Sequence, residues 1–386
     1  MNKGGCKIEK NNSYNFFSLL AVMTIIFAEI DTHFNHEKVS FVAVGDNLIH
    51  PVVYNDAKTH HNDYDFSPMY KNVKPYIKKF DIAYINQESP MGGDDIPYSG
   101  FKRFNTPSDL SKYLVESGFN LINGSNNHAL DKGTHGVNHR VNLWEKYKEK
   151  GVMFTGVYKS KKDNEKLQII NKNGIKIAIL NYTFGTNGLK PENKYQINYL
   201  NENKIKRDVK YAKKYSDAVI VSTHWGQESH HYPNKKQERY AKVFANSNVD
   251  AVIGMHPHVI QPVKWVKGIN NHKTLVVYSL GNFLNGQNTG NESNNLCGSI
   301  NFDITKKGQK IVIKNVHWKS LVNYYRERIP GNKDSRYDFT VYPLDKYNNK
   351  IANEHGMQSG ENKDMTKEHM ERITNEIIDK EFLKSN

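Results

Sequence analysis

The 386-residue chain has only two cysteines, Cys6 and Cys297. They lie on opposite sides of an apolar segment near the N-terminus, so we expect no disulfide between them and no thiolate in the chemistry of the protein. The chain also lacks an internal repeat and an arginine-rich arm. The apolar segment itself, residues 16–28, is shorter than the about 20 residues that span a bilayer comfortably.

Acidic residues are in deficit, with 40 Asp and Glu against 54 Lys and Arg, which gives a formal net charge of +14. The excess is mainly lysine and is spread along the whole chain, a pattern typical of a solvated surface. We therefore expect no nucleic-acid partner. A surplus of this size favours a polyanionic partner, such as an anionic lipid, a wall polymer or an acidic polypeptide.

Three parts are predicted along the chain. Residues 1–38 are a basic leader with Lys3, Lys7 and Lys10, followed by the apolar segment and a tether. This pattern predicts an uncleaved signal-anchor in the cell membrane with the main domain outside the cell, and the alternative is a cleaved, secreted protein. Residues 39–325 form the main domain. Residues 326–386 are a polar C-terminal extension, in which 365–383 is either a helix or a peripheral tail.

Strand-like and helix-like segments alternate over the first two thirds of the main domain, and hairpin-like strands follow. Helices are predicted at residues 69–80, 107–118 with Ser108 as cap, 135–150, 205–215 and 237–246. Asn173-Gly174 predicts a hairpin turn. The pattern indicates an α/β fold with mixed sheets.

Five predicted strands each end on a residue that can bind a metal ion. Those residues are Asp46, Glu88, Asn127 with His128, His224, and the pair His256 and His258. Singly, each has a structural explanation, because Asp46 could cap a turn, Asn127 could hold a left-handed turn and Glu88 could cap a helix. Because sites in open α/β sheets form at the ends of strands, the shared position predicts one site.

Two carboxylates, one amide and four imidazoles exceed what one divalent ion needs, which suits two ions bridged by a carboxylate. Oxygen and nitrogen ligands without thiolate favour manganese, iron or zinc over calcium. Such a pair of ions supports hydrolysis of a phosphoester.

Six motifs together resemble the CapA (PgsA-type) family of poly-γ-glutamate capsule synthesis, a branch of the calcineurin-like metallophosphoesterases. They are Gly45-Asp46, Asn86-Gln-Glu88, Asn126-Asn-His128-Ala-Leu-Asp131-Lys-Gly133, His224-Trp-Gly226, Gly254-Met-His-Pro-His-Val259 and Tyr278-Ser-Leu-Gly-Asn-Phe283. The resemblance covers residues 39–285. It implies a four-layer αββα sandwich.

The resemblance also implies roles for single residues. Asp46, Glu88, Asn127, His224, His256 and His258 would be the metal ligands, with Glu88 as the bridge. His128 would donate a proton to the leaving group, and Asp131 would orient it. The superfamily has a histidine where this chain has Leu48, and His50 is the nearby substitute. With His50, the residues Trp225, Glu228 and Asn282 are candidates for lining the substrate pocket.

Three functions are consistent with these features. The first is a membrane-anchored, exported component of poly-γ-glutamate capsule biosynthesis, whose partners the resemblance places among the polyglutamate synthase and membrane export subunits. The second is an exported metal-dependent phosphoesterase that acts on phosphorylated small molecules or wall polymers. The third is a non-catalytic scaffold that binds an anionic polymer.

Overall fold

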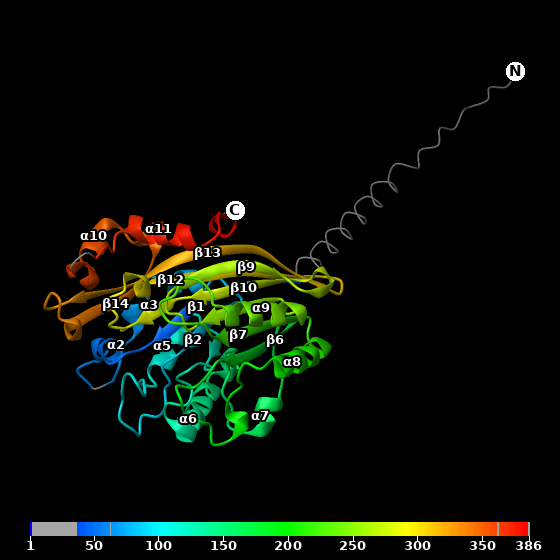
Figure 1. The fold of residues 1–386 in the computed structure, drawn as a ribbon, viewed down its shortest axis with the longest axis horizontal. Coiled ribbons are helices and arrows are strands. Elements are labelled where there is room, and N and C mark those ends of the chain that lie inside the picture. The colour runs from blue at the N-terminus through cyan, green and yellow to red at the C-terminus, as the bar shows by residue number, and fades with distance from the viewer. Residues whose placement is uncertain (2–36, 62, 361–362, 385–386) are drawn as a thin grey trace.

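Two β-sheets face each other in the computed structural model, which describes residues 1, 37–61, 63–360 and 363–384 (Figure 1). The predicted leader and apolar segment therefore lie almost wholly outside the described residues. Within those ranges, none of the helices combines the length and the apolarity that crossing a bilayer requires.

The first sheet has eight strands. Their order is β14 (Arg336–Pro343), β13 (Lys310–Glu327), β12 (Leu296–Lys307), β1 (Lys38–Leu48), β2 (Ile82–Gln87), β3 (Leu121–Asn123) and β4 (Met153–Thr155), and β11 (Asn282–Asn285) pairs with β1 beside this path. Strands β1 to β4 are parallel, whereas β12, β13 and β14 are antiparallel. The mixed sheet agrees with the change from alternating to hairpin-like segments in the sequence.

The second sheet has six strands. Their order is β5 (Gln168–Lys172), β6 (Ile175–Thr183), β7 (Ala218–His224), β8 (Ala251–Met255), β10 (Lys273–Leu280) and β9 (Ile260–Lys267). The predicted hairpin joins β5 to β6, and Asn173 and Gly174 both have positive φ, of 47° and 76°, as a tight hairpin turn requires.

Alternation of side chains along the strands builds the core between the sheets. Phe41 and Ala43 of β1 point inward and pack with Ile177 and Ile220 of the second sheet, while Val42 points to the opposite face. Helices cover both outer faces, so the α/β prediction and its four αββα layers are confirmed. The first sheet is covered by α2 (Pro51–Asp56), α3 (Ser67–Tyr70), α4 (Lys74–Ile77), α5 (Leu110–Glu116) and α6 (Gly133–Glu145), and the second by α8 (Glu202–Tyr215) and α9 (Lys235–Asn246).

Two helix predictions need correction. The single helix predicted at 69–80 is divided into α3 and α4, because Pro75 has no backbone N–H to donate to the Lys71 carbonyl and is tolerated only in the first turn of a helix, where it lies in α4. The helix predicted at 107–118 begins only at Leu110. Ser108 does not cap it, since its hydroxyl group contacts the His139 ring at 3.0 Å instead.

The C-terminal segment packs on the strands of the first sheet. The boundary predicted at residue 326 falls inside β13, and the chain beyond it supplies β14, α10 (Asn349–Asn353), α11 (Lys367–Ile377) and α12 (Lys380–Leu383). The side chains of Met370, Ile377 and Phe382 are buried in the core that contains Trp318 of β13. These helices lie along β13 in Figure 1, where they cover part of the wider sheet that the second sheet leaves open.

Candidate metal centre

The carboxyl ends of strands from both sheets bring the predicted ligands together. Asp46 lies near the end of β1, Glu88 directly follows β2, and Asn127 lies in the loop after β3. His224 ends β7, and the loop with His256 and His258 follows β8. Parallel strands that run in one direction expose their carboxyl ends at one edge, which is why residues far apart in sequence meet here.

Asp46 is held in place by backbone and side-chain donors. The Asn86 Nδ2 donates to Asp46 Oδ1 at 2.6 Å, and the His256 backbone N–H donates to Oδ2 at 3.2 Å. The preceding Gly45 is needed for space, since a Cβ at this position would lie 1.9 Å from the carbonyl oxygen of Gly281. The close contact lets β1 pair with β11 and directs Asp46 into the centre.

Two groups of ligand atoms share Glu88. One group is Asp46, Glu88 and His258, and the other is Glu88, His224 and His256, with the ligand atoms of each group within 4.8 Å of one another. Glu88 Oε1 lies 3.5 Å from His224 Nε2 and 3.8 Å from His258 Nε2. Asn127 joins the second group, because its Oδ1 lies 3.0 Å from His224 Nε2.

Buried polar atoms without partners indicate that these residues fit a metal ion. Both carboxylate oxygens of Glu88 and the Nδ1 atoms of His224 and His256 are buried and make no hydrogen bond among the described residues. A buried carboxylate without donors is costly unless a cation neutralises it. The oxygen and nitrogen donor set, without thiolate, suits a divalent ion.

The charges in the centre favour ionised carboxylates. Burial alone would raise the pKa of Glu88, but the neighbouring His258 and His224 hold that pKa well below its usual range. Burial would lower the pKa of His258, yet the carboxylates of Glu88 and Asp46 outweigh burial and raise the pKa to about 9. Burial and the neighbouring His224 and His258 keep the pKa of His256 well below its usual value.

The ligand loop after β8 has a strained backbone. His256 and His258 have φ of 102° and 59°, values that residues with a side chain seldom adopt. Strain of this kind persists where the surrounding structure imposes it, and it concentrates at functional sites. The Nδ1 atom of His258 is held by Asn282 Oδ1 at 2.9 Å, so Asn282 orients a predicted ligand and, being fully buried, does not offer a surface to substrate.

His128 and Asp131 form a buried pair beside the ligands. His128 Nδ1 lies 2.7 Å from Asp131 Oδ2, which also accepts the backbone N–H of Phe104 at 2.8 Å. The ring of Phe104 meets the His128 ring edge-on at 4.7 Å between centroids. Because the carboxylate occupies Nδ1, the Nε2 atom is the ring nitrogen left to exchange a proton.

The remaining predicted residues differ in position. Trp225 is a correction: it is buried in the core under the second sheet, where its Nε1 donates to the Tyr278 carbonyl at 2.9 Å, so it does not line a substrate pocket. His50 belongs to neither ligand group, and burial lowers its pKa to about 4. Glu228 is exposed, and its carboxylate reaches the ligand atoms of His256 and His258.

Two residues beside the centre were missed from sequence. The Phe184 ring, 37% exposed, lies 4.6 Å from the His256 ring, and the Asn187 Nδ2 lies 3.4 Å from His128 Nε2. Both follow β6, whose carboxyl end adjoins that of β7. The strand-end pattern was therefore a usable signal, but neither residue lies in one of the six motifs.

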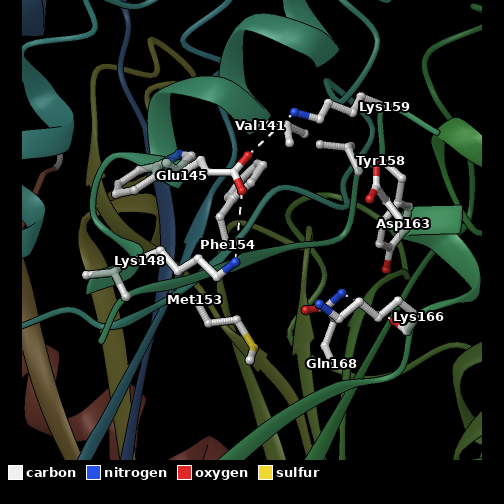
Figure 2. Close-up of a pocket in the computed structure, with 13 residues that line it drawn as sticks. Val141, Glu145, Lys148, Met153, Phe154, Tyr158, Lys159, Asp163, Lys166 and Gln168 are labelled. Carbon is white, nitrogen blue, oxygen red and sulfur yellow. Dashed lines mark hydrogen bonds and ion pairs between the residues drawn. The ribbon is translucent and has the colours of Figure 1, made fainter. Parts of the chain in front are cut away.

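A separate pocket of about 290 Å³ lies between α6, β4 and α7 (Lys161–Glu165) and is drawn in Figure 2. Glu145 forms ion pairs there with Lys148 at 4.0 Å and Lys159 at 3.5 Å. None of its lining residues belongs to either ligand group, so this pocket is not the metal centre.

The fold and the centre define a four-layer α/β protein with candidate divalent-metal ligands at the strand ends. Residues 40–287 match the family model described as bacterial capsule synthesis protein PGA_cap, and the chain belongs to that family. The family resemblance predicted from the six motifs is thereby confirmed.

Two curated relatives carry related names. The chain is 28% identical over 264 residues to the "Capsule biosynthesis protein CapA" of Bacillus anthracis, which covers 65% of this chain and 61% of that protein. It is 28% identical over 220 residues to the "PGA biosynthesis protein CapA" of Bacillus subtilis (strain 168), which covers 56% of each. The chain thus spans less than two thirds of the length of either relative.

Solved structures with a similar arrangement include a 5′-nucleotidase precursor from Thermus thermophilus, at 12% identity and a TM-score of 0.44, covering 74% of this chain and 54% of that one. Another is the calcineurin-like phosphoesterase YfkN from Bacillus subtilis, at 13% identity and a TM-score of 0.44, covering 73% and 90%. Likeness at this level adds nothing to the family assignment.

Proposed function

We propose that the chain acts in poly-γ-glutamate capsule biosynthesis and that it carries a two-metal hydrolytic centre for phosphoesters. The family supports the pathway, and the names of the two Bacillus relatives agree with it. The observation that carries the hydrolytic role is the pair of ligand groups that share the buried, hydrogen-bond-free carboxylate of Glu88. A buried carboxylate without hydrogen-bond donors, placed where two ligand groups meet, is the arrangement that a metal-dependent catalytic centre requires.

The ligand residues would hold one ion between Asp46, Glu88 and His258 and a second between Glu88, Asn127, His224 and His256. Manganese, iron and zinc all match this donor set. Divalent ions in such a centre supply Lewis acidity that polarises a phosphoester toward attack by water.

The protein residues around them handle the proton. The His128 ring would release a proton from Nε2 to the leaving oxygen, and the Asp131 carboxylate would hold the ring through Nδ1. The Phe104 ring packs on His128 and limits the access of water to this pair.

We further propose that residues 16–28 hold the domain at the outer face of the cell membrane, and that its partners are the polyglutamate synthase and membrane export subunits. The support is the order of lysines and apolar residues in the leader together with the family. A surface with a net charge of +14 suits a growing polyanion. Two experiments test this location. Membrane fractionation shows whether the chain is bound to the membrane, and protease treatment of intact cells shows whether the domain lies outside the cell.

The hydrolytic role is tested with the full chain purified in Mn²⁺. We expect hydrolysis of phenyl phosphate and bis(p-nitrophenyl) phosphate that EDTA abolishes and Mn²⁺ restores. An Asp46→Ala, His256→Ala variant should be inactive, and His60→Ala, a change of an exposed histidine, should be fully active. No activity with Mn²⁺, Fe²⁺ or Zn²⁺ would overturn the hydrolytic role.

The pathway is tested in the bacterium that encodes the chain. Deletion of the gene should abolish surface polyglutamate, and the natural gene should restore it. If the double variant restores it as well, the chain acts as a polymer-binding scaffold. If deletion leaves surface polyglutamate unchanged while the enzyme is active, the chain is a phosphoesterase outside capsule synthesis.

A further inference from the structure

The two ligand groups are unequal. The group around His224 has four residues once Asn127 is included, whereas the group around Asp46 has three. One divalent ion usually takes about four to six ligands. The charges are also unequal, because Asp46 and Glu88 offer two formal negative charges against the four positive charges of two divalent ions. The centre therefore has room for one more anionic ligand.

Glu228 lies where such a ligand would be needed. One of its carboxylate oxygens and the ring nitrogens of His256 and His258 lie within 4.8 Å of one another. His258 belongs to the first ligand group and His256 to the second. Glu88 joins the two groups from a fully buried position, and Glu228 reaches one member of each from an exposed loop.

Backbone hydrogen bonds hold the Glu228 loop on the histidine loop. The Trp225 N–H donates to the Met255 carbonyl at 3.0 Å, and the Ser229 N–H donates to the Pro257 carbonyl at 2.8 Å. These two bonds lie on either side of Glu228, so its backbone is tied to the loop that carries both histidines. The fold therefore fixes the backbone from which the Glu228 side chain extends toward the two histidines.

We propose that Glu228 is a carboxylate ligand of the metal centre that joins the two ligand groups from the solvent side. The inference depends on the metal centre of the proposed function and extends it by one residue. With Glu228, three carboxylates face two divalent ions. The remaining formal charge is a single positive one, which suits a site that takes an anionic substrate.

The test is a titration of the full chain with Mn²⁺ alone. Binding is measured by calorimetry and by the electron paramagnetic resonance signal of free Mn²⁺. The variants are Glu228→Gln, which keeps size and removes charge, and Glu228→Asp, which shortens the side chain by one methylene group. Glu238→Gln is the matched control, an exposed glutamate in no ligand group. Thermal unfolding in EDTA confirms that all four proteins are folded.

We expect Glu228→Gln to weaken Mn²⁺ binding about tenfold or more at one or both sites. Glu228→Asp should have a smaller effect, and Glu238→Gln none. If Glu228→Gln binds Mn²⁺ with natural affinity and stoichiometry, the assignment of Glu228 is overturned while the hydrolytic centre stands. If the folded natural chain binds none of Mn²⁺, Fe²⁺ and Zn²⁺ in the same titration, both proposals fail.

Discussion

Glu88→Gln is the change that most directly tests the metal centre. Glu88 belongs both to the ligand group of Asp46 and to the ligand group of His224. Glutamine has the same shape but no charge, and only one of its two terminal atoms can bind a metal ion. The change leaves Asp46 and His258 as the protein ligands on one side. We therefore expect the variant to fold and to lose most of its affinity for divalent metal.

Metal binding to the folded state adds to stability in proportion to RT ln(1 + [L]/Kd). Free Mn²⁺ at about 100 times Kd adds about 2.7 kcal/mol for each occupied site. With about 2.1 cal/mol/K of unfolding entropy per residue over 386 residues, this is a rise in Tm of about 3 °C for each site. Two occupied sites double the rise.

The assay is scanning calorimetry of both proteins in EDTA and in Mn²⁺. The natural chain should gain about 6 °C when both sites fill, and Glu88→Gln should gain less than about 1 °C. Glu376→Gln, an exposed change on α11, reports binding of Mn²⁺ to the surface and should behave like the natural chain. An equal gain in Glu88→Gln and the natural chain would refute a centre bridged by this carboxylate.

Three further changes have defined outcomes. Asp131→Asn should lower kcat about a hundredfold for phenyl phosphate. The loss should be much smaller for p-nitrophenyl phosphate, because its leaving group depends less on a proton from His128. Mn²⁺ affinity measured by calorimetry should not change. His355 is buried and its pKa is lowered to about 4 by burial, so the unfolded chain takes up a proton that the folded chain excludes as pH falls from 6.5. Urea unfolding in EDTA should show that the natural chain is less stable at pH 4 than at pH 7, and His355→Gln should reduce this loss by up to about 3 kcal/mol. An equal loss in both proteins would contradict the lowered pKa of His355. Gly45→Ala should lower the free energy of unfolding by about 3 kcal/mol, because its Cβ meets the Gly281 carbonyl; urea unfolding with no loss would show that this contact yields easily.

Local patterns were enough to predict the strands and the ligands at their ends. The run before Gly254 predicts a buried strand from its apolar, β-branched residues, and the structure has β8 there. His256 and His258 could be recognised as candidate ligands for the same reason, since side-chain chemistry and the end of a strand are both visible in a few consecutive residues. Such features depend little on the rest of the chain.

Long-range contacts decided the features that the sequence did not reveal. The C-terminal segment has no clear periodicity of apolar residues, yet its strand β14 pairs with β13. Its helix α11 covers part of the core, because the first sheet is wider than the second and extends beyond it. Trp225 lies inside the motif that begins with His224, but its indole group faces the core and donates a hydrogen bond to the Tyr278 carbonyl.

The sequence by itself determined the succession of strands along the chain, the types of candidate ligand at their ends and the family to which the chain belongs. The tertiary structure alone decided that Asn282 holds His258 and that Glu228 reaches the histidine loop. The physical reason is that each of these relations links segments far apart in the chain. Their distances are set by the packing of two sheets, which no local pattern specifies.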